Sequence, residues 1–266
     1  PMKKTLAILL LALCLALTLG ACSEPQDVID DPVIDIGTSK MTYTENGKDV
    51  FTYEYKTSTT VIITDYTGEY EPHTLVIPEK IGDRYVAYIG DSAFRASSNI
   101  LSIETKAPLV SIGSYAFADC AALTSLDIPD SVTEIGKGAF YQCQSLTDCS
   151  LPAELTSIGD HAFYLCTSLE SITFPTKVTS LGVAAFYGCS ALTEIVLPEG
   201  IAKVGAQAFY NCSAVTSLTL PASLTNIGDW AFATQLVALS DDAISTVEGS
   251  YAASYVKEQR QNNAHE

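Results

Sequence analysis

Basic residues are scarce in this sequence, and so are histidines. The 266 residues include 14 lysines and arginines against 31 aspartates and glutamates, which gives a formal charge of -17, and they include three histidines. A nucleic-acid-binding protein needs Lys and Arg to neutralise phosphates, so this charge argues against nucleic acid as a partner. His73, His161 and His265 lie far apart in the sequence, and we expect His161 to face solvent. A Cys–His catalytic pair is therefore not predicted.

The usual catalytic and metal-binding motifs are also missing. The sequence holds no CxxC pair, no Cys–His cluster with zinc spacing, no GxSxG, no phosphate-binding glycine loop and no calcium loop of alternating aspartates. We therefore expect a protein that is not an enzyme, holds no metal and needs no cofactor.

The N-terminal segment has the pattern of an export signal. Two lysines follow Met2, an apolar run covers residues 6–19, and small residues then lead directly to Cys22. The run is too short to span a bilayer comfortably, so residues 1–21 are predicted to be a signal peptide. The ending resembles the bacterial lipoprotein cleavage box, which implies lipidation of Cys22; an ordinary signal peptide beside an unrelated cysteine is the alternative. Residues 22–40 are acidic and contain prolines, which predicts a tether.

A six-residue motif, here called the repeated phrase, occurs seven times in the chain: an aliphatic residue, Gly, two variable residues and then Ala-Phe. The copies recur every 23 residues without insertion or deletion, with phenylalanines at Phe94, Phe117, Phe140, Phe163, Phe186, Phe209 and Phe232. Such a fixed period indicates a solenoid in which each unit stacks on the one before. Before each internal phrase, alternating apolar and polar residues end at a proline, as in residues 123–129. This pattern predicts one short parallel strand per coil, ended by the proline.

The whole unit, LxxLxLPxxLxxIGxxAFxxC in residues 123–143, resembles the 23-residue leucine-rich repeat of BspA-like bacterial surface proteins. The resemblance covers about residues 75–234. It implies a β-rich leucine-rich repeat solenoid, a curved right-handed superhelix with seven coils over residues 75–235. The first and last copies depart from the unit, because Ser97 and Gln235 replace its cysteine and a longer loop, residues 79–88, enters the first copy.

The ends of the array are predicted to be capped. Residues 41–74 alternate like strands around Asn46-Gly47, a turn typical of hairpins, so they are expected to form an N-terminal β-hairpin cap. Residues 236–266 are expected to form a C-terminal cap that contains an amphipathic helix, because Tyr251 and Tyr255 fall at helical spacing.

Cysteines recur at one position of the repeat. We interpret them as buried thiols that pack as small apolar groups, since five identical positions in a row cannot all pair. Disulfides, which stacked coils would be close enough to form, and metal binding are the alternatives. The residues concerned are Cys120, Cys143, Cys166, Cys189 and Cys212, with Cys149 outside the series.

Two sets of variable positions are candidate ligand-binding sites. The first is the outward side of the predicted strands, with Ser125, Asp127, Asp148, Ser171, Thr173, Glu194 and Thr219. The second is a ladder of tyrosines that directly follow the Ala-Phe pairs, Tyr141, Tyr164, Tyr187 and Tyr210. These rings either stack on one another to shield the phenylalanines or form an aromatic stripe that contacts a protein or glycan.

The resemblance implies an exported adhesin-like protein that binds a host or extracellular protein at the bacterial surface. Glycan binding and a structural envelope role are the alternatives, and an enzyme is disfavoured. We expect a monomer that is attached to the membrane only through the lipid on Cys22.

Overall fold

The computed structural model describes residues 40–263 except residues 46, 48, 69 and 70. The predicted signal peptide, Cys22 and the tether up to residue 39 lie outside the described residues. None of the helices described is long and apolar enough to cross a membrane.

The N-terminal part is an antiparallel sheet that continues into the repeats. Strands β1 (Met41–Glu45), β2 (Asp49–Tyr55) and β3 (Thr60–Thr67) pair in antiparallel order, as the hairpin pattern predicts. Strand β3 then pairs in parallel with β6 (Arg84–Ile89). The longer loop of the first copy is itself a hairpin, because β5 (Lys80–Ile81) pairs antiparallel with β6.

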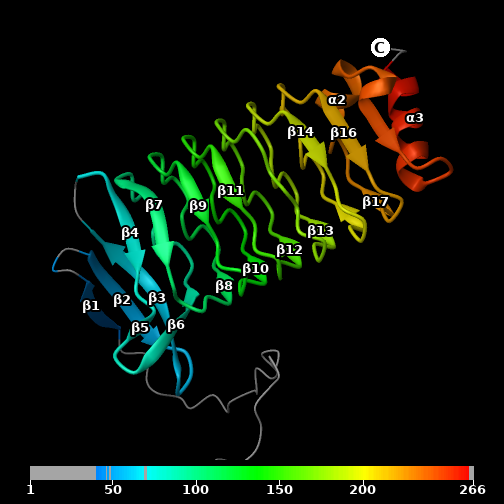
Figure 1. Ribbon diagram of the computed structural model, residues 1–266. Helices are drawn as coiled ribbons and strands as arrows, with labels where there is room; N and C mark the ends of the chain where they lie inside the picture. The colour runs from blue at the N-terminus through cyan, green and yellow to red at the C-terminus, as the bar shows by residue number, and fades with distance from the viewer. Residues whose placement is uncertain (1–39, 46, 48, 69–70, 264–266) are drawn as a thin grey trace, which may run out of the picture. The chain divides into compact units, whose positions relative to one another are not determined.

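The repeats form a solenoid with two ladders of parallel strands (Figure 1). The first ladder, here called the strand face, consists of the predicted strands β4 (His73–Ile77), β7 (Ile100–Thr105), β9 (Ser125–Asp127), β11 (Asp148–Ser150), β14 (Glu194–Val196) and β16 (Ser217–Leu220). It ends with β18 (Ile244–Thr246), which the sequence did not predict. The stacked parallel strands are thus confirmed.

A second strand in each coil was not predicted. It contains the aliphatic residue of the repeated phrase and pairs with its equivalents in the neighbouring coils. After β6 this ladder consists of β8 (Ser111–Ile112), β10 (Glu134–Ile135), β12 (Ser157–Ile158), β13 (Ser180–Leu181), β15 (Lys203–Val204) and β17 (Asn226–Ile227). A strand of two residues is too short to show alternation, which is why the sequence does not reveal it.

The strand face is interrupted between β11 and β14. The intervening coil contains Ser171 and Thr173, but these residues are not part of a strand, although the repeat predicts one there. This coil carries Phe174, whose ring packs edge-on against Phe186 and Phe209 at centroid distances of 5.5 and 6.3 Å. We attribute the interruption to this ring, which is larger than the Ile and Leu at the same position in other coils.

Phenylalanines form a continuous stack inside the solenoid. All seven of the repeated phrase are at most 2% exposed, and successive ring centroids lie 4.8–5.6 Å apart. The chain bends sharply around each ring. The residue two before each Phe has a positive φ in all seven copies, as at Ser92, Tyr115 and His161. The glycine of the phrase is required by close approach, since a Cβ on Gly182 would lie 2.4 Å from the backbone nitrogen of Asp160.

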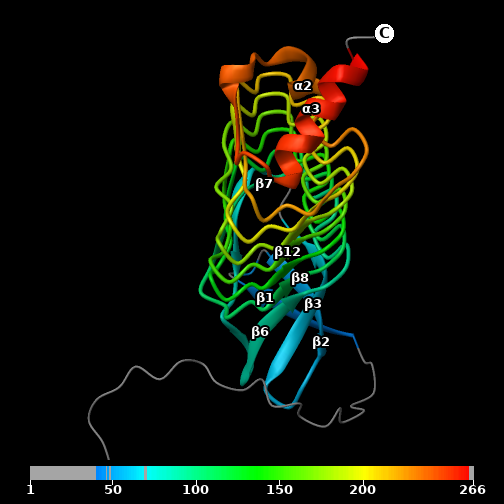
Figure 2. The same ribbon diagram turned by 90° about the vertical axis from the view of Figure 1, so that its right-hand side faces the viewer.

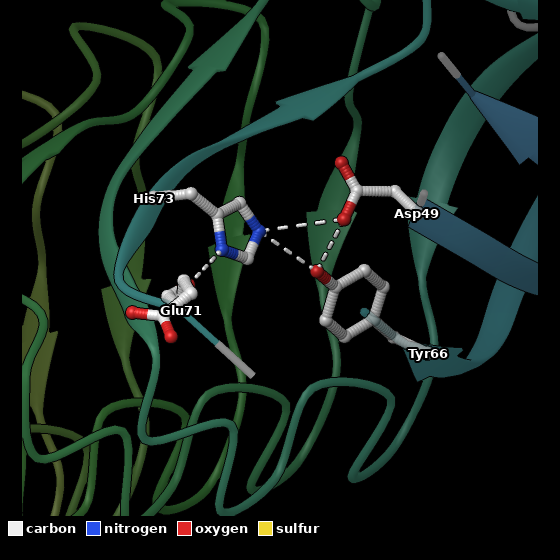
Figure 3. A network of polar contacts seen from close by, with 4 residues as sticks. All are labelled: Asp49, Tyr66, Glu71 and His73. Atoms are coloured by element: carbon white, nitrogen blue, oxygen red, sulfur yellow. Dashed lines mark hydrogen bonds and ion pairs between the residues drawn. The ribbon is translucent and has the colours of Figure 1, made fainter. Parts of the chain in front are cut away.

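The N-terminal end of this stack is covered by Phe51 and Tyr66, whose ring centroids lie 6.3 and 5.2 Å from that of Phe94. The Tyr66 hydroxyl donates to the Asp49 carboxylate at 2.6 Å and lies 3.0 Å from Nε2 of His73 (Figure 3). His73 Nε2 is also 3.3 Å from the Asp49 carboxylate, which is 10% exposed. The polar groups therefore hold the covering ring in place while they partner one another.

The C-terminal end is covered by helices. Helix α2 (Ala233–Ala238) is followed by the 3₁₀ turn η1 (Asp241–Ala243) and by α3 (Tyr251–Asn263). Helix α3 packs against α2 and β17 at the last coil (Figure 2). The predicted C-terminal helix is confirmed, but the side expected to face inward is wrong: Tyr251 is 44% exposed, whereas Ala252 is buried.

Candidate binding surfaces

The cysteine ladder is structural. Each thiol is buried and donates a hydrogen bond to the carbonyl of the Phe located 26 residues earlier, as Cys166 does to Phe140 at 3.2 Å. The same bond joins Cys120 to Phe94, Cys143 to Phe117, Cys189 to Phe163 and Cys212 to Phe186. The prediction of buried free thiols is confirmed.

These thiols are unsuited to nucleophilic chemistry. Burial raises the pKa of Cys120 and of Cys166 from 9.0 to about 12. The thiol is thus the dominant form near neutral pH, whereas the thiolate is the nucleophile and the metal ligand. Among the residues that the structure describes, no group of three or more His, Cys, Asp or Glu is arranged to hold a metal ion.

Gln235 replaces the cysteine in the last copy and performs the same task. Its side-chain nitrogen donates to the carbonyls of Phe209 at 3.2 Å and Cys212 at 3.0 Å, and the residue is 1% exposed. The sequence marks Gln235 only as a departure from the repeat. The structure shows that it closes the row of hydrogen bonds at the last coil.

The tyrosine ladder forms a tight stack. Ring centroids lie 4.9 Å apart between Tyr141 and Tyr164, 4.8 Å between Tyr164 and Tyr187, and 5.5 Å between Tyr187 and Tyr210. The interplanar angles are 2°, 15° and 22°. Each inner ring therefore has a neighbour on both faces, and burial raises the pKa of Tyr164. What remains accessible is mainly edges and hydroxyls.

The ladder is longer than the sequence indicated. Tyr115 packs edge-on against Tyr141 at 6.2 Å, and Trp230 lies 6.3 Å from Tyr210 with 59% of its surface exposed. His161 lies 5.6 Å from Tyr164. Tyr115, His161 and Trp230 all occupy the position two residues before Phe, so a comparison of that position across copies could have found them. His161 is half-buried, so the expectation that it faces solvent was wrong: its ring packs on the ladder.

The strand face carries acidic side chains that point outward. Along β9, β11 and β14 the middle residue is buried and its two neighbours are exposed. Ser125 lies beside Asp148 in register, and Asp127 beside Ser150. In the described part of the chain, no ion pair involves Asp127, Asp148 or Glu194. The remaining predicted residues of this face are Ser171 and Thr173, which are exposed at the interruption, and Thr219, which is half-buried.

Two hollows lie on the strand face. A recess of about 440 Å³ occurs at the interruption and is lined by Asp148, Ser171 and Thr173 among others. A larger groove of about 710 Å³, here called the N-terminal groove, lies where β4, β7 and β9 end and is bordered by β1. Sequence patterns did not predict it, because it combines residues of the cap with residues of three coils.

Comparison with known proteins gives the family. The model of the BspA type leucine-rich repeat region matches in six copies over residues 74–190 and 156–246. A search of curated proteins finds no match. A leucine-rich repeat solenoid is generally a non-enzymatic binding scaffold.

Solved structures of bacterial leucine-rich repeat proteins are similar. A T. pallidum leucine-rich repeat protein is 27% identical with a TM-score of 0.47, over 67% of this chain and 79% of that chain. A protein from Bacteroides ovatus is 26% identical with a TM-score of 0.49, over 68% and 49%. The pneumococcal vaccine antigen PcpA is 19% identical with a TM-score of 0.51, over 80% and 51%. This chain thus spans about half the length of the last two. Since the family model matches more than half of the residues, the chain belongs to the BspA-type leucine-rich repeat family.

Proposed function

We propose that this chain is an exported bacterial surface protein that binds an extracellular or host protein through its strand face. The observation that carries the proposal is the contrast between the two candidate surfaces. The ring faces of the inner tyrosines are covered by neighbouring rings of the stack. The side chains of Asp127, Asp148 and Glu194, in contrast, are exposed and form no ion pair among the described residues. Outward groups without internal partners are available to a ligand.

A position at the cell surface is part of the proposal. The apolar segment before Cys22 supports export, and a lipid on Cys22 would be the single contact with the membrane. Membership of the BspA-type family supports the same location, and one structural relative is described as a vaccine antigen. With an anchor at one end, the strand face would be free to meet soluble or cell-bound partners. The protein acts as a monomer in this proposal.

Glycan binding is the second candidate, and the tyrosine geometry weighs against it. Sugars stack on open ring faces, and the inner rings of the ladder have none. Trp230 at the end of the ladder is the exception, since it is 59% exposed. A structural role in the envelope is the third candidate and would need no soluble ligand. Catalysis is not proposed: burial raises the pKa of the Cys120 and Cys166 thiols to about 12, and a protonated thiol is a poor nucleophile.

A binding screen tests the proposal. A recombinant chain that begins at Ser23 is applied to immobilised extracellular-matrix proteins and to a glycan array. We expect saturable binding to a protein, weakened by the double substitution Asp148→Ala and Glu194→Ala and unchanged by Tyr164→Ser with Tyr187→Ser. Binding to glycans alone, or co-purification from intact cells with envelope proteins alone, would overturn it.

A further inference from the structure

We propose that the N-terminal groove binds an extended, basic segment of the protein partner. This inference rests on the proposed function. It specifies where on the strand face the partner binds and that the bound segment of the partner is basic. The groove is the larger of the two hollows on this face, and its volume of about 710 Å³ lies within the range of about 300–1,000 Å³ typical of ligand sites.

The groove has an apolar base with a polar rim. Ile77 and Ile103 lie in its base at 2% and 7% exposure, beside Val76, which is 37% exposed. Pro78 and Pro129 line the ends of the first and third coils. Neighbouring strands are about 4.8 Å apart, so a segment that crosses the ends of β4, β7 and β9 contacts a surface about 10 Å wide.

The rim is acidic. Four carboxylates line the groove, those of Glu45, Glu79, Glu104 and Asp127, against the ammonium groups of Lys80 and Lys106. Lys80 is committed elsewhere, since its Nζ lies over the ring of Tyr85 at 4.2 Å from the centroid.

Most of these carboxylates lack partners within the molecule. Among the described residues, no ion pair or hydrogen bond involves the side chains of Glu79, Glu104 or Asp127, and all three are exposed. Glu45 accepts one hydrogen bond, from the Tyr43 hydroxyl at 2.6 Å. A basic ligand could therefore pair with these carboxylates without breaking an ion pair within the protein.

An extended segment with alternating side chains fits both features. In such a segment, successive side chains point to opposite sides, so apolar residues can face Val76 and the isoleucines while Lys or Arg reach the rim. The aliphatic stems of Lys and Arg also cover apolar surface while the charges stay in water. The excess of acid over the whole chain opposes occupation by a second copy.

Fluorescence anisotropy with two labelled peptides tests the inference. One is a ten-residue peptide in which Lys alternates with Thr or Val, and the other has Glu in place of every Lys. We expect the basic peptide to bind and the acidic one not to bind. Glu104→Lys with Asp127→Lys should raise the Kd of the basic peptide at least about tenfold. Raising the salt from 50 to 500 mM should weaken binding, because exposed charges are screened within about a Debye length.

The matched control is Glu134→Lys with Glu248→Lys, which changes the net charge equally at exposed sites outside the groove. We expect this variant to change the Kd less than about twofold. If circular dichroism shows that Glu104→Lys with Asp127→Lys does not fold, the neutral double variant Glu104→Gln with Asp127→Asn is used instead. Equal weakening by both variants, equal binding of both peptides, or no binding of the basic peptide would overturn the inference. If this inference fails while Asp148→Ala with Glu194→Ala still weakens protein capture, the proposed function stands without it.

Discussion

The row of buried thiols predicts an unusual sensitivity to alkaline pH. Burial raises the pKa of five cysteines above 9.0: to about 12 for Cys120 and Cys166, and in the same direction for Cys143, Cys149 and Cys189. The unfolded chain releases these protons near pH 9, while the folded chain retains them. The free energy of unfolding is therefore unaffected by these thiols below about pH 9, and it falls as the pH rises from there toward the pKa of the folded state.

The size of the loss follows from the unfolded pKa. At pH 10, a thiol with a pKa of 9.0 is mostly deprotonated in the unfolded chain. This deprotonation stabilises the unfolded state by about 1.4 kcal/mol per thiol, because the folded chain retains the proton. Cys120 and Cys166 together lower the free energy of unfolding by about 3 kcal/mol between pH 8 and pH 10, and Cys143, Cys149 and Cys189 add to this loss in the same direction. A domain is typically stable by about 5–15 kcal/mol, so this loss is a large part of the total. Tyr255, whose pKa is raised from 10.0 to about 12, adds to the loss only above pH 10.

Urea unfolding followed by far-UV circular dichroism measures this effect at pH 8, 9 and 10, with a reductant present throughout. The double variant Cys120→Ala with Cys166→Ala removes the two thiols whose pKa is raised to about 12, so its loss between pH 8 and pH 10 should be about 3 kcal/mol smaller than that of the unaltered protein. The free energy of unfolding of each protein is compared with its own value at pH 8. This comparison cancels the loss of stability caused by the cavities that the Cys→Ala substitutions leave. Parallel pH curves for the two proteins would refute the reasoning.

Three further predictions test the core, the last coil and the tyrosine ladder. Phe163→Ala removes a ring with 0% exposure from the middle of the stack and should cost about 3–5 kcal/mol in urea unfolding, against less than about 0.5 for Val196→Ser on the strand face. Equal costs would contradict the stack. Gln235→Ala should cost about 1–3 kcal/mol, because it removes two buried hydrogen bonds at the last coil, and a change near zero would show that the bonds contribute nothing. Tyr164→Ser with Tyr187→Ser should lower the melting temperature and leave protein binding unchanged; lost binding at an unchanged melting temperature would assign the ladder to the ligand.

The fold was predictable because its interactions repeat. A contact between one coil and the next is encoded again 23 residues later, so the stacked phenylalanines and the buried cysteines are visible as a period. The second ladder was missed because each of its strands after β6 has two residues, which is too few for a pattern. The network of Asp49, Tyr66 and His73 was missed because its members come from three strands of the cap and none of them repeats.

The N-terminal groove was missed for the same physical reason, since it combines residues of the cap with residues of three coils. Several polar side chains of the regular array bond to the backbone of a neighbouring coil. The carboxylates of Asp91 and Asp160 each accept a hydrogen bond from a backbone nitrogen 23 residues later at 2.7 Å, and Thr147 donates to the carbonyl of Thr124. Among the described residues, the side chains of Glu79, Glu104 and Asp127 form no such bond, as is also true of Asp148 and Glu194 on the strand face. Glu104 and Asp127 are left exposed beside a hollow, and a ligand can complete there what the next coil completes elsewhere.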